Sequence, residues 1–185
     1  KEAMKEEMRE RNSAAKLFLS ESLKNAEIYV NGDKIQSGAK EIASKINDAL
    51  GKLVSTVYHK LSYIDTAMSE SDIRTLFKNN GQQLTLAGTN TAKNELALHD
   101  VNDYIALNTQ RLMKTSMKSI LERFLKAPYG FVEADVQWLV AKLFKDSEIA
   151  MFVNNDAVTL LSKTPEEIIR YLTRNEFNEK LMTEK

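Results

Sequence analysis

The chain has 185 residues, and its 26 Lys and Arg side chains are balanced by 26 Asp and Glu side chains. A net charge of zero argues against a nucleic-acid arm or a polybasic membrane anchor as a property of the whole chain. The absence of cysteine excludes a disulfide scaffold, a zinc site with thiolate ligands and a cysteine nucleophile. With only 6 Gly and 2 Pro, we expect long helices and few turns.

The sequence contains no signal for the membrane. No apolar stretch approaches the roughly 18 residues that a spanning helix needs, and the charged start of the chain is unlike a signal peptide. We therefore expect a soluble protein. Because the chain begins at Lys1 rather than at Met, we also expect an excised piece of a longer polypeptide.

Residues 1–80 are predicted to form a helical region that contains one β-hairpin. Mixed charges over a thin apolar stripe predict a long surface helix over 1–25. Asn31-Gly32 lies between two short alternating runs within residues 27–36. This pair is a strong hairpin signal, because both central residues of a two-residue turn need positive φ angles.

A longer apolar pattern follows the predicted hairpin. Apolar residues recur every three or four positions from Ile42 to Ile64, which predicts one amphipathic helix. Ser71 and Asp72 are residue types that cap helices, so a shorter helix is expected to begin there. Residues 81–100 are predicted to form a linker or irregular segment, which is the best candidate for a domain boundary.

Residues 101–185 are predicted to form the second domain. Helical periodicity runs through 101–126 and is ended by Pro128 and Gly130. A further core-facing helix is predicted over 132–146, from apolar residues spaced by three and four. Next to His99, Asp100 is expected to cap a helix.

The last third of the chain combines a hairpin with a capped helix. Two asparagines between two apolar runs predict a hairpin over 149–161. An N-cap threonine, a proline at the first helical position and a glutamate at the third predict a helix that begins at Thr164. This helix is expected to run to about Arg174, with a last turn through Phe177 and Leu181.

The fold class is therefore mainly α with two short β-hairpins (α+β). The order of helix 104–126, helix 132–146 and hairpin 149–161 resembles a winged helix, in which a helix enters the DNA major groove and the hairpin is the wing. The charges do not suit DNA, because Glu133 and Asp135 are expected on the exposed face of the second helix. A winged helix that packs against protein, or acts as an intramolecular lid, fits these charges better.

One segment, residues 108–126, has an uneven charge distribution. The segment contains several basic side chains but a single carboxylate, that of Glu122. A helix would place several of these cations on one side, where they could contact phosphates. The five candidate nucleic-acid contacts are Arg111, Lys114, Lys118, Arg123 and Lys126. An ordinary solvated face opposite the core stripe would carry the same charges, so the pattern leaves both interpretations open.

No motif in the sequence supports catalysis. A phosphate-binding loop needs G-x-x-x-x-G-K-[ST], but around Gly51-Lys52 the first glycine is replaced by Ile46 and the hydroxyl residue by Leu53. Two histidines without cysteine give no metal-ligand set. An enzyme that acts alone is therefore the weakest hypothesis, and no catalytic, cofactor-binding or metal-binding residue is proposed.

The segment APYGFVEADVQWLVAKLFKDSEIAMFVNNDAVTLL resembles a region C-terminal to the ATPase core in large bacterial P-loop proteins of the BREX phage-exclusion system. NAEIYVNGDKIQ and LGKLVSTVYHKLSYID are similar to the same family, so the resemblance covers about residues 24–65 and 104–185. It implies a cytoplasmic phage-defence protein whose parent chain uses ATP and magnesium, with partners from the same system and DNA nearby. The family's nucleotide motifs match no position here.

Two functional hypotheses follow. The leading one is a non-catalytic accessory or interaction region of a larger P-loop ATPase, which needs no cofactor of its own and works with the rest of that ATPase and other proteins of the system. The alternative is a DNA-binding winged-helix module that contacts phosphates through the basic face of helix 108–126.

Overall fold

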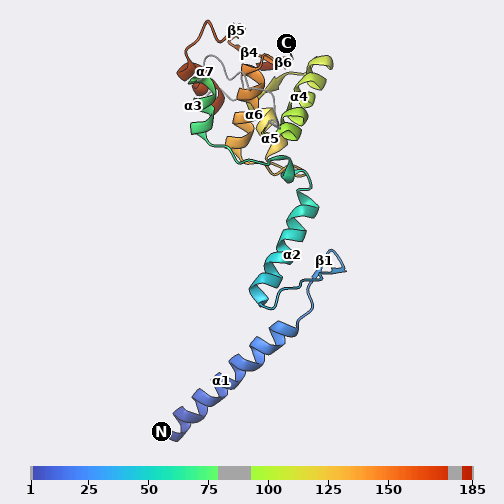
Figure 1. Cartoon of the computed structure of the whole chain (residues 1–185), viewed down its shortest axis with the longest axis vertical. Coiled ribbons are helices and arrows are strands. Elements are labelled where there is room, and N and C mark those ends of the chain that lie inside the picture. The colour runs from blue at the N-terminus through green and yellow to red at the C-terminus, as the bar shows by residue number, and fades with distance from the viewer. Residues whose placement is uncertain (1, 79–92, 175–180, 185) are drawn as a thin grey trace, which may run out of the picture. The chain divides into compact units, whose positions relative to one another are not determined.

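The structure is a computed structural model that describes residues 2–78, 93–174 and 181–184. The chain folds into two compact units, unit 1 (Lys1–Val57) and unit 2 (Tyr58–Lys185). In chain order (Figure 1) the elements are α1 (Glu2–Asn25), β1 (Tyr29–Val30), β2 (Asp33–Lys34), α2 (Ile42–Val57), the 3₁₀ helix η1 (Leu61–Tyr63), α3 (Glu70–Lys78), α4 (Glu95–Gln110), β3 (Thr115–Ser116), α5 (Met117–Phe124), α6 (Glu133–Lys145), β4 (Ile149–Val153), β5 (Asp156–Val158), α7 (Pro165–Thr173) and β6 (Leu181–Glu184). The mainly helical fold class with two hairpins is confirmed.

The two units divide at Val57, whereas the sequence placed the boundary in residues 81–100. Helix α3 was assigned to the first domain, but it packs against α6 and α7 in unit 2. Helix α4 begins at Glu95, inside the predicted linker, while residues 81–92 lie outside the described residues. The buried side chains of Ile73 and Phe77 account for the difference, because they belong to the core of unit 2.

Unit 1 contains α1, the hairpin β1–β2 and α2. The hairpin forms as predicted, since β1 and β2 pair antiparallel and the N–H of Ile35 donates to the carbonyl of Ile28 at 2.8 Å. Asn31 and Gly32 have φ angles of 54° and 90°, which a two-residue hairpin turn requires. The predicted long helix over 1–25 is confirmed as well.

The predicted single helix from Ile42 to Ile64 is wrong in its last part. Helix α2 ends at Val57, and a turn and the 3₁₀ helix η1 follow. The N–H of Lys60 donates to the carbonyl of Pro128 at 3.0 Å, so the backbone there pairs with a distant loop of unit 2 instead of with the preceding helical turn.

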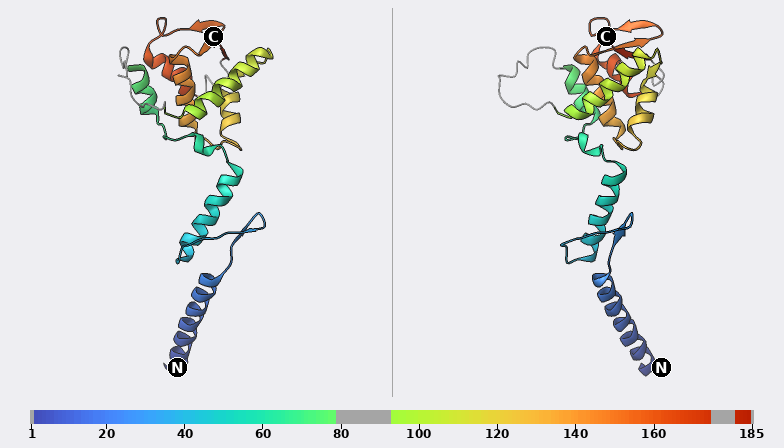
Figure 2. Two further views of the ribbon diagram at one scale, coloured as in Figure 1. Left: turned by 45° about the vertical axis from the view of Figure 1, so that its right-hand side comes forward. Right: turned by 90° about the vertical axis from the view of Figure 1, so that its right-hand side faces the viewer.

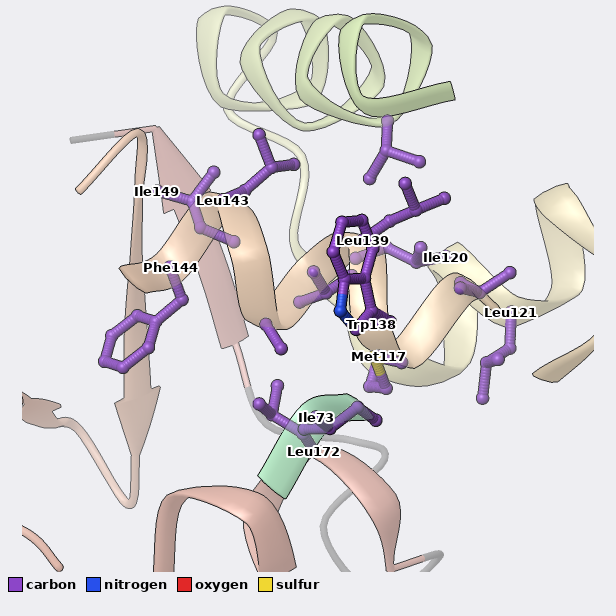
Figure 3. Close-up of a cluster of buried hydrophobic side chains, with 14 of the residues drawn as sticks. Ile73, Met117, Ile120, Leu121, Trp138, Leu139, Leu143, Phe144, Ile149 and Leu172 are labelled. Atoms are coloured by element: carbon purple, nitrogen blue, oxygen red, sulfur yellow. The ribbon is translucent and has the colours of Figure 1, made fainter. Parts of the chain in front are cut away.

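Helix α6 forms the centre of unit 2. It packs against α3, α4, α5, α7 and β4. Figure 3 shows Trp138 and Leu139 of α6 among side chains of the surrounding helices, including Ile120, Ile73 and Leu172. Those three side chains and Leu139 are at most 1% exposed. This cluster is part of the hydrophobic core of unit 2 and joins α3, α5, α6 and α7.

The sheet of unit 2 has the strand order β3-β6-β4-β5, and all its pairs are antiparallel. The hairpin β4–β5 is confirmed, with φ angles of 56° and 69° at Asn154 and Asn155. The predicted last helical turn is wrong at Leu181, because Leu181–Glu184 forms β6 and pairs with both β3 and β4, while Phe177 lies outside the described residues. Its partners lie far away in the sequence, so no local pattern indicates this strand.

The predicted helix over 101–126 is broken into α4 and α5. At the end of α4 the N–H of Met113 donates to the carbonyl of Asn108 at 2.8 Å, and that of Leu112 donates to the carbonyl of Thr109 at 3.0 Å. These two hydrogen bonds form a Schellman motif, whose left-handed residue is usually glycine. Here it is Leu112, with φ of 56°, which apolar periodicity alone does not indicate.

Replacing Leu112 with glycine is expected to raise the free energy of unfolding of unit 2 by about 1 kcal/mol, since a left-handed conformation costs an L-residue roughly 1–2 kcal/mol. Little contact is lost, because Leu112 is 94% exposed. Urea unfolding followed by the fluorescence of Trp138 measures the change. Met113→Gly is the control, because Met113 is also exposed but has no positive φ, and an equal gain there would contradict this explanation.

Local hydrogen bonds fix the start of α7 and of α3. Thr164 and Glu167 form the predicted capping box of α7, in which the hydroxyl of Thr164 accepts from the N–H of Glu167. Helix α3 begins at Glu70, slightly earlier than predicted. Ser69 precedes it, and its N–H donates to the carboxylate of Asp72 at 2.8 Å. The hydrogen bond from the hydroxyl of Ser69 is the main reason that the pKa of Asp72 is lowered, and the backbone hydrogen bond adds to it.

Candidate interaction surface

Helix α6 occupies the position of the helix that enters the major groove in a DNA-binding winged helix, since it precedes the hairpin β4–β5. Nine of its 13 residues are buried. The buried side chains come from all sides of the helix, and they include those of Asp135 and Trp138, which are 4% and 6% exposed. With Glu133 as its single exposed residue, α6 has little surface to present to base edges.

Helices α3 and α7 cover the side of α6 that α4 and α5 leave open. Both helices contact α6 and also contact each other. Figure 1 shows α3 and α7 together on one side of α6, with α4 and α5 on the other, and the views in Figure 2 agree. The surface that a DNA-binding winged helix uses for bases is thus occupied by protein within unit 2.

The prediction that Asp135 lies on an exposed face of helix 132–146 is wrong. Its Oδ1 accepts a hydrogen bond from the N–H of Met68 at 2.7 Å, and this contact is buried. Asp135 lies in the first turn of α6, where the helix dipole favours a carboxylate. Its role is to attach the segment before α3 to the start of α6. Glu133 is exposed, as expected.

The wing also lacks features that would favour phosphate binding. The hairpin β4–β5 contains no Lys or Arg between Ile149 and Val158. Its turn residues Asn154 and Asn155 are exposed, as is Asp156 at the start of β5. A wing that contacts the DNA backbone normally supplies cations, because phosphate contacts dominate affinity.

The five predicted nucleic-acid contacts do not share one helical face, because the predicted helix is broken. They lie at the end of α4, in the turn that follows, in α5 and just after α5. All five side chains are exposed: Arg111, Lys114, Lys118, Arg123 and Lys126. The guanidinium carbon of Arg123 lies 5.6 Å from the ring centroid of Tyr129.

The turn between α4 and β3 exposes two large apolar side chains between two cations. Leu112 is 94% exposed and Met113 is 57% exposed, while Arg111 and Lys114 flank them. Sequence periodicity assigned these residues to a continuous helix, so it missed the turn. The left-handed backbone at Leu112 holds its side chain away from the core.

Lys60 is at the centre of a polar cluster that joins three segments of unit 2. Its Nζ donates to the carboxylate of Asp100, and it lies 5.3 Å from the ring centroid of Tyr63 and 5.1 Å from that of Tyr129. The hydrogen bond to Asp100 is the main reason that the pKa of Lys60 is raised. Asp100 lies inside α4 rather than at its N-cap, so the expected capping role is wrong. The cluster therefore has a structural role, because it holds the segments of Tyr63, Asp100 and Tyr129 together.

The structure offers no metal centre among residues 2–78, 93–174 and 181–184, since no three potential ligands of the His, Cys, Asp and Glu types come together there. Within the same part of the chain, no helix combines the length and apolar composition needed to cross a bilayer.

A family model described as the BREX ATP-binding protein BrxC winged helix-turn-helix domain matches residues 60–185. The chain belongs to the BrxC family. A second model, described as the BrxC 4th domain with six-stranded beta sheet, matches residues 1–53. No solved structure matches the chain. The gap between the two BrxC matches contains Val57, where the structure divides into its two units.

The BrxC matches confirm the resemblance to the BREX system and the winged-helix assignment of the C-terminal half. Within the matched residues, the three helices α4, α5 and α6 precede the hairpin β4–β5, which is the element order expected of a winged helix and its wing. The elements that sequence reasoning missed are the strands β3 and β6 and the covering role of α3. Each depends on contacts between segments that are distant in the chain.

Proposed function

We propose that this chain is a non-catalytic interaction region of a BrxC-type ATP-binding protein in the BREX defence system. In this proposal the winged helix packs against protein, and its partners are the rest of the ATP-binding protein and other proteins of the same system. The observation that carries the proposal is the burial of α6, whose possible DNA-binding face is covered by α3 and α7.

The position of the Gly-Lys pair also supports a non-catalytic role. Gly51-Lys52, the only Gly-Lys pair in the sequence, lies inside α2 rather than in a phosphate-binding loop. ATP and magnesium would then act elsewhere in the ATP-binding protein, and the BrxC description names such a protein. This chain would transmit or stabilise an arrangement of partners without itself needing a cofactor.

A second candidate function is DNA binding through phosphates. It is favoured by the exposure of Arg111, Lys114, Lys118, Arg123 and Lys126, which lets these cations reach a polyanion without any change in the core. In this case the contacts would be independent of sequence, because α6 supplies no base contacts.

Fluorescence anisotropy with a labelled DNA duplex separates the two candidates. For a protein-packing module we expect a Kd weaker than about 10⁻⁴ M at physiological salt, which is the weak end of non-specific DNA binding. The same sample, supplied with magnesium and ATP, is expected to release no phosphate.

The decisive variant is the double charge reversal Lys114→Glu with Lys118→Glu. Its matched control is Lys5→Glu with Lys16→Glu on the exposed helix α1, which changes the net charge equally. Binding in the micromolar range that falls steeply with salt, is lost in the first variant and persists in the control would replace our proposal with the DNA-binding function.

A further inference from the structure

Unit 1 has almost no hydrophobic core. Helix α1 contains no buried residue, and Ala49 is the only buried residue of α2. The stripe of α2, which we define as five large apolar residues, is exposed: Ile46 (46%), Leu50 (52%), Leu53 (40%), Val54 (43%) and Val57 (44%). A helix of this length draws most of its stability from packing an apolar face, so the stripe lacks its partner within unit 1.

The sheet of unit 1 is equally incomplete. Among residues 2–57, all of which the structure describes, β1 and β2 form a two-stranded sheet with two residues in each strand. The family model that matches residues 1–53 is described as a domain with a six-stranded sheet. A lone two-stranded hairpin is marginal in water and is normally stabilised by further strands or by a covering helix. Here β1 contacts α2, so the hairpin and the helix already lie together.

We infer that the stripe of α2 packs on one face of a six-stranded sheet, to which the hairpin β1–β2 belongs and whose other strands come from polypeptide outside these 185 residues. The stripe has the spacing of a helix that covers a sheet, with apolar residues at positions 46, 50, 53 and 57. The same interface would complete the hydrogen bonding of the hairpin edges and cover the exposed apolar side chains of α2.

A second copy of the chain does not satisfy these observations. It would add two strands of two residues each, which falls short of six strands. An unrelated protein could cover the stripe, but it would not account for the match to a domain with a larger sheet. The occupant that accounts for both the apolar stripe and the short hairpin is therefore sheet from the same polypeptide.

Hydrogen exchange measured by mass spectrometry tests this inference. The amides of α2 are compared between the 185-residue chain and the intact BrxC-family protein. We expect exchange in α2 to be at least about 100-fold slower in the intact protein, because packing on the sheet suppresses local opening of the helix. The exchange of α6 in unit 2 is expected to be the same in both proteins.

Two variants of the intact protein locate the interface. Leu53→Asp places a charge in the stripe and is expected to restore fast exchange in α2. Ser44→Asp is the matched control, because it adds the same charge on the opposite side of the helix and is expected to leave the protection unchanged.

Two results would overturn the inference. One is equal protection of α2 in the dilute 185-residue chain, which would show that unit 1 is complete as it stands. The other is protection of that chain that appears only with concentration, in parallel with dimer formation in sedimentation, which would identify a second copy as the occupant. Neither result depends on whether unit 2 binds DNA, so this test and that of the proposed function can fail separately.

Discussion

Replacing Asn94 with alanine is expected to lower the free energy of unfolding of unit 2 by about 3 kcal/mol or more. Asn94 is fully buried, and its Oδ1 accepts from the N–H groups of Asp65 and Thr66, both at 2.9 Å. Its Nδ2 donates to the carbonyl of Thr66 at 2.9 Å. Alanine removes the partner of these three part-buried backbone groups, and each lost hydrogen bond costs about 1 kcal/mol.

The backbone adds to this loss. Asn94 has φ of 58°, and asparagine tolerates the left-handed region better than alanine does. Trp138 is a convenient probe, because it is the single tryptophan of the chain and is buried in unit 2. The shift of the urea unfolding midpoint of unit 2, followed by the fluorescence of Trp138, gives the change in the free energy of unfolding.

Asn102→Ala is the matched control for this experiment. The Oδ1 of Asn102 is buried without a hydrogen-bond partner, so removing it is expected to cost less than about 1 kcal/mol. If the two alanine variants lose the same stability, the hydrogen bonds of Asn94 do not account for its effect.

Gly130→Ala is expected to destabilise unit 2 by about 2 kcal/mol or more. A Cβ at this position would lie 2.5 Å from Cδ1 of Tyr58 and 3.0 Å from its Cε1 and Cγ. The ring would have to move as a whole, because its Cγ is too close as well. In addition, φ is 67°, a left-handed conformation that costs alanine about 1 kcal/mol or more.

Gly51→Ala provides the comparison. Nothing lies within 4 Å of a Cβ at Gly51, which is in the interior of α2. Alanine there favours the helix by roughly 0.5–1 kcal/mol, so circular dichroism should show equal or higher helicity and the Trp138 transition should not move. An unchanged urea midpoint for Gly130→Ala would refute the proposed steric role of this glycine.

Features that depend on neighbouring residues could be predicted from the sequence. The capping box at Thr164 and Glu167 and the hairpin turn at Asn154 and Asn155 use side chains and backbone angles that the residue types themselves favour. In both cases the pattern and the structure agree, because no distant contact competes with the local preference.

Features that oppose the usual preference of a residue type, or that depend on distant contacts, could not be predicted. The break at Leu112 opposes the usual preference for glycine, and continuous apolar periodicity masks it. Likewise, α2 ends at Val57 although apolar spacing continues to Ile64, and Lys60 in that stretch has its backbone partner at Pro128. Periodicity reports which side chains are apolar, but not where the chain turns.

The same limit applies to the candidate surface. The sequence predicts the five cations as candidate contacts and favours protein packing over DNA binding for helix 132–146, and both stay predictions. It could not show that Asp135 is buried against Met68, because a carboxylate in the first turn of a helix is usually solvated. The cover provided by α3 was missed because α3 was assigned to the other domain.

The place of β6 in its sheet has a consequence for synthesis on the ribosome. β6 lies between β3 and β4, so the hairpin and β3 are joined only through residues 181–184. Translation proceeds at roughly 5–20 residues per second, so Leu181 is added several seconds after Ser116. From the synthesis of β4 until that of β6, the nascent chain carries β3 and β4 with open edges, and a chaperone or a neighbouring nascent chain could pair with them. The helices around α6 can assemble earlier, but the sheet closes last.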